Sequence, residues 1–423
     1  MIQYNITAPR QLRAAINLPA SKSVSNRALI IHALSGGQQL PENLSDCDDT
    51  NVMINALKDM PDVIDIKAAG TAMRFMTAYL SVRGSHHTLT GTKRMTQRPI
   101  WPLVNALRQM GADIAYAVNE GYPPLTITGQ RLDGGLLEIA GNMSSQYVSA
   151  LLMIGPVLRN GLTLKLTGEV ISRPYIDLTL WMMREFGADA EWTSADTIEV
   201  KPRPYQQRSY YIENDWSGAS YWYEMVALTD DEEAEIRLAG LTDGSKQGDS
   251  CLRYIFSLLG VKTTFGSKEP GKPTTVVLRR NGRRVHRLEY DFVNCPDLAQ
   301  TFVVTCALMD IPFRFEGLST LKIKETDRIK ALKAEMRKLG YVLRDEHDSV
   351  LLWDGERCEP MADAAIDTYE DHRMALAFAP AALRLPSLRI NNPGVVTKSY
   401  PHFWDDLRSA GFGIVTNDRE DGE

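Results

Sequence analysis

Apolar residues recur at helical spacing in several segments of the chain, and five of these segments run directly into a glycine. A glycine at this position is typical of the left-handed residue that ends a helix. A sixth segment, residues 52–60, ends at Pro61, which cannot continue a helix. The five segments with their glycines are 102–110 with Gly111, 178–186 with Gly187, 252–259 with Gly260, 329–339 with Gly340 and 403–410 with Gly411.

A second series of polar residues marks six helix starts upstream of these stops. Ser, Thr and Asp are preferred there because their side-chain oxygens accept from unpaired backbone N–H groups. Each start precedes the following stop by 40 or 43 residues, and short alternating stretches such as HTLTGT and LTLKLTG predict strands between the helices. The predicted starts are Ser21, Thr71, Ser144, Ser217, Asp297 and Asp371.

This spacing predicts six copies of one α/β (α+β) unit, each with two helices and several strands. A solenoid also produces repeats, but the period is long and the terminal copies lack polar capping character. Two similar domains of three repeated units each fit the chain length better. The boundary is expected near Asn214-Asp215, which gives a first domain at 20–214 and a second at 215–423. Residues 1–19 precede the first copy and could supply a strand to either domain.

Composition narrows the class of protein. Of the 423 residues, 44% are hydrophobic and 24% are charged, as in ordinary globular proteins, and no apolar stretch reaches the ~18 residues of a membrane span. The N-terminus lacks the layout of a signal peptide. Five cysteines are an odd number, so we expect reduced thiols in a cytoplasm. The absence of CxxC and HExxH motifs disfavours a metal site, and a net charge of −6 disfavours a nucleic-acid partner.

The helix starts carry basic residues where the helix dipole disfavours them. Lys22, Arg27, Arg74 and Arg373 lie at or near such starts. Cations together with exposed N–H groups form an anion site, so these positions predict a phosphate or carboxylate cradle. The alternative is a set of capped helices with solvated basic faces.

Other residues near the helix starts have both a functional and a purely structural interpretation. Gly70 would allow a ligand to approach the backbone, or would only form a tight turn. Ser144 and Ser145 suit phosphate oxygens, or simply cap a helix. In Lys324-Glu325-Thr326-Asp327-Arg328, the cations would bind anions and Glu325 would move protons, unless the segment is an exposed, salt-bridged helix start.

Nine sequence blocks together resemble one family, the 5-enolpyruvylshikimate-3-phosphate synthases. They are LPASKSVSNRAL, AGTAMR, RMTQRPI, SSQYVSALL, ISRPYIDLTL, PDLAQT, KETDR, DHRMA and VVTKSYPHFWDDL, in that order along the chain. The resemblance implies two domains of three similar units joined by two crossover segments, which assigns residues 1–19 to the second domain with 215–423. It also implies a mixed sheet in each unit.

The resemblance implies transfer of the enolpyruvyl group of phosphoenolpyruvate to the 5-hydroxyl of shikimate 3-phosphate, without a metal or organic cofactor. Asp297 matches the family's proton acceptor, and Lys22 and Glu325 are both candidates for moving the methylene proton. The implied contacts of shikimate 3-phosphate are Lys22, Ser23, Arg27, Ser144, Ser145, Gln146, Ser172, Asp297 and Lys324. The implied contacts of phosphoenolpyruvate are Lys22, Gly70, Arg98, Gln146, Arg328, Arg373 and Lys398.

Four positions depart from the residues usual in this family. Ala20 replaces Gly, Ala68 replaces Asn, Phe75 replaces Pro and Thr320 replaces Asn. These positions border the implied substrate sites, so they bear on substrate affinity and on sensitivity to the herbicide glyphosate.

Two other functions were weighed against this one. The related UDP-N-acetylglucosamine enolpyruvyl transferase usually has a reactive Cys before an Arg-Pro, and here residues 91–99 contain no Cys. An inactive anion-binding repeat scaffold is the other alternative, although Lys22, Asp297, Glu325 and Arg373 are all present. For the enzyme we expect a cytoplasmic monomer whose partners are its two small-molecule substrates, with no nucleic acid or membrane partner.

Overall fold

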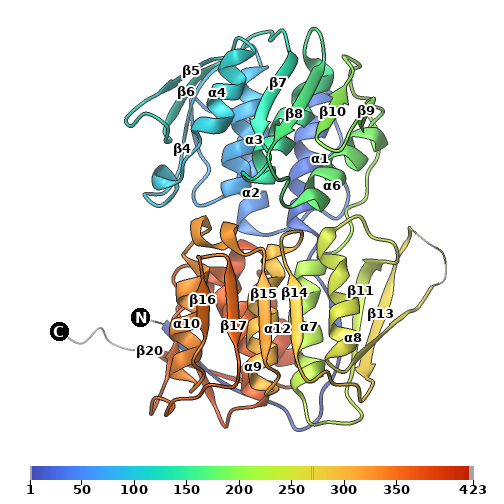
Figure 1. The fold of residues 1–423 in the computed structure, drawn as a ribbon. Coiled ribbons are helices and arrows are strands. Elements are labelled where there is room, and N and C mark those ends of the chain that lie inside the picture. Colours follow the sequence, from blue (N-terminus) through green and yellow to red (C-terminus); the bar gives the residue numbers. More distant parts are fainter. Residues whose placement is uncertain (1, 268, 270, 419–423) are drawn as a thin grey trace. The chain divides into compact units, whose positions relative to one another are not determined.

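The computed structural model describes residues 2–267, 269 and 271–418, and the chain divides into two compact units (Figure 1). The first unit is Ala20–Ile212, and the second combines Met1–Pro19 with Glu213–Glu423. The sequence puts the boundary after residue 214, whereas the first unit ends at Ile212. Glu213 explains part of the difference, because its carboxylate accepts hydrogen bonds from Trp216, Thr242 and other groups of the second unit.

Five four-stranded sheets share one pattern, in which the first two strands in sheet order are parallel and the remaining neighbours are antiparallel. The first unit contains two of them: β3 (Val63–Asp65), β4 (His86–Thr90), β6 (Leu125–Thr128) and β5 (Asp113–Tyr116); and β7 (Gly135–Ala140), β8 (Leu162–Thr167), β10 (Thr197–Val200) and β9 (Ala190–Trp192).

The second unit contains the other three sheets in the same pattern. They are β2 (Arg13–Asn17), β11 (Glu235–Thr242), β13 (Pro273–Arg280) and β12 (Val261–Phe265); β14 (Leu288–Asp291), β15 (Phe313–Glu316), β17 (Val350–Trp353) and β16 (Arg344–Glu346); and β18 (Ala365–Ile366), β19 (Leu388–Asn391), β1 (Ile2–Thr7) and β20 (Gly413–Asp418).

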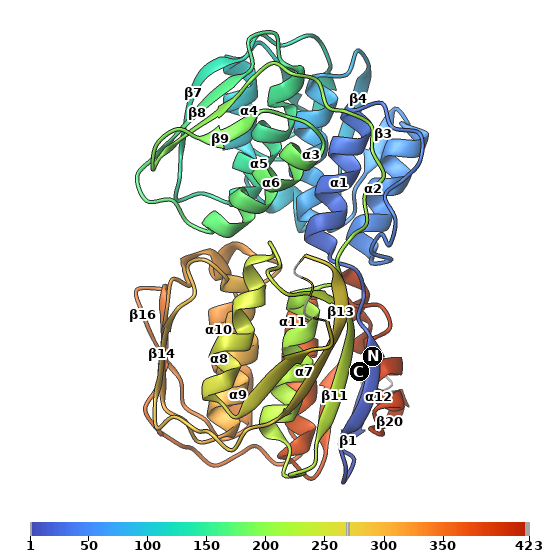
Figure 2. The same cartoon turned by 90° about the vertical axis from the view of Figure 1, so that its right-hand side faces the viewer.

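The N-terminal segment completes two sheets of the second unit. Strand β2 lies parallel to β11, and β1 lies between β19 and β20, antiparallel to both. Figure 2 shows the blue N-terminal segment beside β11. These pairings assign residues 1–19 to the second unit, as the resemblance implies.

Each copy of the repeat supplies a pair of α-helices, and the two helices differ in burial. The first helix of each pair is buried on nearly all sides, whereas the second leaves one face exposed, as expected for a helix at the surface. The pairs are α1 (Lys22–Leu34) and α2 (Asp48–Asp59), α3 (Gly70–Ser81) and α4 (Trp101–Gln109), α5 (Ser145–Ile154) and α6 (Arg173–Glu185), α7 (Trp216–Leu228) and α8 (Leu252–Leu258), α9 (Ala299–Leu308) and α10 (Arg328–Lys338), and α11 (His372–Phe378) and α12 (Phe403–Ser409).

The first copy departs from the others in its strands. Where the other copies have a four-stranded sheet, the chain around α1 and α2 pairs through one parallel bridge between Glu42 and Tyr211. The Asn43 side chain also donates to the Ile212 carbonyl at 2.7 Å, which ties the same two extended segments together.

The predicted glycine stops are confirmed. The glycines after α4, α6, α8, α10 and α12 all have positive φ, between +82° and +97°, which a residue with a Cβ rarely adopts. After α2 the left-handed residue is Met60, with φ +39°, and Pro61 follows it. The predicted helix starts are correct at Ser21, Ser144 and Asp371, which are N-caps.

The other three predicted starts are displaced by local geometry. Ala69 precedes α3, so Thr71 lies inside its first turn. Asp215 is the N-cap of α7 and accepts from Ser217 and Gly218. Asp297 lies in a short 3₁₀ helix, η4 (Pro296–Leu298), directly before α9. Among the described residues, no helix combines the length and apolarity that crossing a bilayer requires.

Candidate active site

In the first unit, Lys22 begins α1 and its ammonium group faces a carboxylate. Its Nζ lies 3.2 Å from Oδ2 of Asp49, which is 4% exposed in the first turn of α2. Ser21 caps α1 by accepting from Val24, which fixes the turn that carries Lys22. Asp49 was not predicted from the sequence, since nothing local to α2 indicates which cation lies opposite it.

Arg27 lies inside the first unit and links three helices. Its guanidinium donates to the Ser23 carbonyl in α1, to the Ser149 hydroxyl in α5, and to the Thr179 hydroxyl and Tyr175 carbonyl in α6. Burial lowers the pKa of Arg27 to about 10, and the Tyr175 hydroxyl opposes this shift only in part. These partners are all neutral, so the local charge of Arg27 is not cancelled by them.

Two further guanidinium groups flank the start of α3. A Cβ on Gly70 would lie 2.8 Å from Arg98 Nη1 and 3.3 Å from Arg74 Nη1, so a larger residue would displace these guanidinium groups. Arg74 also donates to the Gly70 carbonyl, and its guanidinium lies over the Tyr147 ring.

The serine-rich helix starts of the first unit are partly engaged in capping. The Ser144 hydroxyl accepts from Gln146 N, and the Gln146 side chain donates to Thr71 at 3.0 Å, which joins the starts of α5 and α3. Ser145 is nearly buried. Ser172 precedes α6 with φ +53°, a strained conformation for serine of the kind that concentrates at functional sites.

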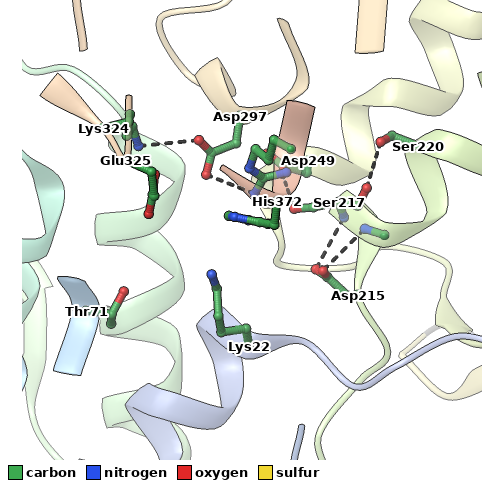
Figure 3. Close-up of polar contacts among 12 residues, drawn as sticks. Lys22, Thr71, Asp215, Ser217, Ser220, Asp249, Asp297, Lys324, Glu325 and His372 are labelled. Atoms are coloured by element: carbon green, nitrogen blue, oxygen red, sulfur yellow. Dashed lines mark hydrogen bonds and ion pairs between the residues drawn. The ribbon is translucent and has the colours of Figure 1, made fainter. Parts of the chain in front are cut away.

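In the second unit, Asp297 is surrounded by cations from three segments. Its Oδ1 accepts from Arg328 at 3.0 Å, and its Oδ2 accepts from Arg373 at 3.1 Å. Oδ1 also lies 3.3 Å from Lys324 Nζ (Figure 3). Burial raises the pKa of Asp297, but Arg373, Lys324 and Arg328 outweigh it and hold the pKa well below its usual range.

Arg328 is the centre of this cluster. It is 1% exposed and begins α10, and it bonds the carboxylates of Asp371, Asp297 and Glu325. Asp371 is fully buried and receives two of its N–H groups, at 2.7 and 3.2 Å. Burial alone would lower the pKa of Arg328, but these three carboxylates raise it.

The cluster extends to the remaining predicted cations of the second unit. Lys398, at the end of the 3₁₀ helix η7 (Pro393–Lys398), lies 2.9 Å from Oε1 of Glu325. Arg373, in the first turn of α11, also donates to the Tyr221 hydroxyl of α7. The second unit thus brings together Asp297, Glu325, Arg328, Arg373, Lys324 and Lys398. Asp371 was predicted only as a helix cap, and its role as partner of Arg328 had no local signal.

No group of three or more His, Cys, Asp or Glu side chains is arranged to hold a metal ion within the part of the chain that the structure describes. The carboxylates of the second unit are instead paired with Lys and Arg. In the second unit, the arrangement places cations that can bind anionic groups next to the Asp297 carboxylate.

Two solved structures illustrate the fold that this chain shares. An EPSP synthase from Acinetobacter baumannii aligns with a TM-score of 0.79 at 20% identity, covering 99% of this chain and 100% of that chain. The enolpyruvyl transferase NikO from Streptomyces tendae aligns with a TM-score of 0.72 at 16% identity, covering 98% and 99%. At these identities the likeness concerns the fold.

Sequence comparison defines the family. The family model for EPSP synthase (3-phosphoshikimate 1-carboxyvinyltransferase) matches residues 6–62 and 58–407. The chain is 60% identical over 413 residues to a 3-phosphoshikimate 1-carboxyvinyltransferase of Bacteroides fragilis, covering 98% of this chain and 99% of that protein. It is 34% identical to the protein of the same name from Sulfurovum sp., covering 95% and 97%. The chain therefore belongs to the EPSP synthase family.

Proposed function

We propose that this protein transfers the enolpyruvyl group of phosphoenolpyruvate to the 5-hydroxyl of shikimate 3-phosphate and releases phosphate, a step of the shikimate pathway to aromatic amino acids. Family membership supports this reaction. The observation that carries the proposal is the convergence of Lys324, Arg328 and Arg373 on the Asp297 carboxylate. It combines anion-binding groups with a base, which this reaction needs together.

Both substrates carry charged groups that the predicted site residues would hold. We assign shikimate 3-phosphate to Lys22, Ser23, Arg27, Ser144, Ser145, Gln146, Ser172, Asp297 and Lys324. Phosphoenolpyruvate carries a phosphate and a carboxylate, so it requires several cations. We assign it to Lys22, Gly70, Arg98, Gln146, Arg328, Arg373 and Lys398.

Asp297 would act as the base that takes the proton of the 5-hydroxyl. With three cations beside it, the pKa of Asp297 is held far below its usual range, which makes the carboxylate a weak base. A phosphate or carboxylate bound to the same cations would offset their charge, so its arrival would raise the pKa of Asp297. Under this proposal, phosphoenolpyruvate both supplies the reacting group and activates the base.

The methylene carbon of phosphoenolpyruvate must gain a proton and lose it again, and two groups remain candidates. Lys22 is paired with Asp49, and Glu325 is paired with Arg328 and Lys398. The chemistry needs no metal or organic cofactor. The five free thiols support a cytoplasmic setting. We further propose a monomer without nucleic-acid or membrane partners.

Phosphate release from the purified protein tests the proposal. We expect release only when phosphoenolpyruvate and shikimate 3-phosphate are present together, with one phosphate formed per enolpyruvyl group transferred. Release with UDP-N-acetylglucosamine in place of shikimate 3-phosphate would support the related transferase instead. Binding of both substrates without release would indicate an inactive anion-binding scaffold.

A further inference from the structure

Two of the five cysteines lie side by side although 44 residues separate them in the sequence. The sulfur atoms of Cys251 and Cys295 are 3.5 Å apart, within hydrogen-bonding distance for sulfur. Cys295 is 1% exposed, whereas Cys251 is only partly buried. The pair therefore combines one thiol that a small reagent can reach with one that it cannot.

The surroundings make the two thiols unequal. The hydrogen bond with Cys295 lowers the pKa of Cys251 most, and the Tyr290 hydroxyl adds to this, while burial and Asp249 oppose it. The same hydrogen bond raises the pKa of Cys295, and burial raises it further. Cys251 is also the more exposed of the two residues, so we expect its thiolate to be the one that attacks a disulfide.

Cys295 is next to the candidate site, whereas Cys251 belongs to a neighbouring segment. Cys295 directly precedes η4, which carries Asp297. Cys251 ends the 3₁₀ helix η3 (Gly248–Cys251), in which Asp249 accepts from the Ser217 hydroxyl in the first turn of α7. Figure 3 shows Asp249, Ser217 and Asp297 in one region of the second unit. A covalent link between the two sulfurs would join η3 to the segment that holds Asp297.

We propose that Cys251 and Cys295 form a reversible oxidation site whose co-reactant is a low-molecular-weight disulfide. The Cys251 thiolate attacks one sulfur of the reagent, which releases one thiolate and leaves a mixed disulfide on Cys251. Cys295 then loses its proton and attacks the Cys251 sulfur, which releases the second small thiol. Two protein thiols are oxidised to one disulfide, and the reagent is reduced to two thiols.

Closing the bond should disturb the position of Asp297. The sulfurs must approach from 3.5 Å to about 2.05 Å, and η3 and the Asp297 segment must absorb this movement. A displacement of about 1 Å in a catalytic group can cost about 10²-fold in rate. The oxidised protein should therefore turn over more slowly than the reduced protein. This consequence rests on the proposed function, whereas formation of the disulfide does not.

Mass spectrometry after treatment with glutathione disulfide tests the site. In the wild type we expect loss of two hydrogen atoms and a cross-linked pair of peptides that contain Cys251 and Cys295. Cys295→Ser lacks the resolving thiol, so glutathione should remain attached at Cys251. Cys251→Ser should form no internal disulfide and should carry no glutathione at position 251 or at Cys295. The matched control is Cys358→Ser, since Cys358 is also partly buried and its thiol contacts only the Arg337 carbonyl among the contacts described.

Turnover measured on the same samples tests the consequence. We expect a loss of about 10²-fold on oxidation of the wild type and of Cys358→Ser, with recovery after dithiothreitol, and no such loss in Cys251→Ser. Glutathione that stays on wild-type Cys251, without an internal disulfide, would overturn the proposed site. A disulfide that leaves turnover unchanged would overturn its link to Asp297. A reduced enzyme without turnover would contradict the proposed function, while the mass measurement would still decide the oxidation site.

Discussion

Arg27 of the first unit and Arg328 of the second are both buried guanidinium groups, but their partners differ in charge. Arg27 donates to carbonyl and hydroxyl oxygens, and burial lowers its pKa to about 10. Arg328 donates to three carboxylates, which raise its pKa despite burial. The protein leaves the charge of Arg27 uncompensated, whereas it pairs the charge of Arg328 with carboxylates.

A buried cation can hold segments of the chain together or bind a ligand, and the charge of its partners indicates which. A guanidinium that is matched by buried carboxylates fixes segments of chain, because removing either partner leaves an uncompensated charge. A guanidinium that is held by neutral groups is positioned without being neutralised, which suits ligand binding. We therefore expect Arg328 to matter most for folding and for the position of Asp297, and Arg27 to matter most for affinity.

The largest expected effect is on stability, in Arg328→Met. Arg328→Met removes the cationic partner of Asp371, whose carboxylate is fully buried. Breaking such a pair costs about 3–5 kcal/mol in the free energy of unfolding. Arg27→Met is the matched control and should cost less than about 2 kcal/mol, since it leaves only neutral groups behind. Urea denaturation measures both, and equal losses would contradict the comparison.

The next effect is on turnover, in Asp297→Asn. An amide cannot accept the hydroxyl proton, so we expect turnover to fall by about 10²–10⁴-fold. The fold should persist because Arg328 still pairs with Asp371 and Glu325. Removing one carboxylate leaves the cations more available to anions, so the dissociation constant of phosphoenolpyruvate should not rise. Near-wild-type turnover would remove Asp297 from its catalytic role.

Much of the fold could be predicted from the sequence because its repeat has local signals. Five helices run into a glycine in the left-handed conformation, which glycine adopts most readily, so Gly111, Gly187 and the later stops mark the copies directly. The pairing of strands within the sheets could not be predicted in this way. Strand β1 pairs with β19 and β20, as in Gln3 with Asn391, and no local pattern in residues 2–7 indicates partners so far along the chain.

The cations of the candidate site could be predicted from the sequence, but the carboxylates that pair with them could not. Cations near helix starts are unusual by residue type, so Lys22 and Arg373 could be selected from the sequence. Their carboxylate partners could not, because an Asp near a helix start has an ordinary explanation as a cap. Asp49 and Asp371 acquire their roles only from cations that lie on other segments.

A smaller effect is expected on affinity, in Arg27→Ala. Loss of a charge-assisted contact should weaken binding of shikimate 3-phosphate by roughly 1.5–3 kcal/mol, and binding of phosphoenolpyruvate by less. Calorimetry with each ligand measures the two changes separately. The same loss for both ligands would mean that Arg27 shapes the surroundings in general through its contacts to α5 and α6.

The smallest expected effect concerns Phe75, which stands where the family usually has Pro. The Arg27 guanidinium carbon lies 5.4 Å from the centre of the Phe75 ring, and both side chains are buried. A cation–π contact of this kind contributes about 0.5–2 kcal/mol. Phe75→Leu keeps an apolar side chain but removes the ring face, so shikimate 3-phosphate should bind about 2–5-fold more weakly.

A double-mutant cycle decides whether Phe75 acts through Arg27. If the ring matters because it orients the guanidinium, Phe75→Leu should have almost no further effect on binding in the Arg27→Ala background, and the coupling energy should be about 0.5–1 kcal/mol. Additive losses in calorimetry would mean that Phe75 only fills space in α3. In that case only the hydrogen-bond partners in α1, α5 and α6 would position the Arg27 guanidinium.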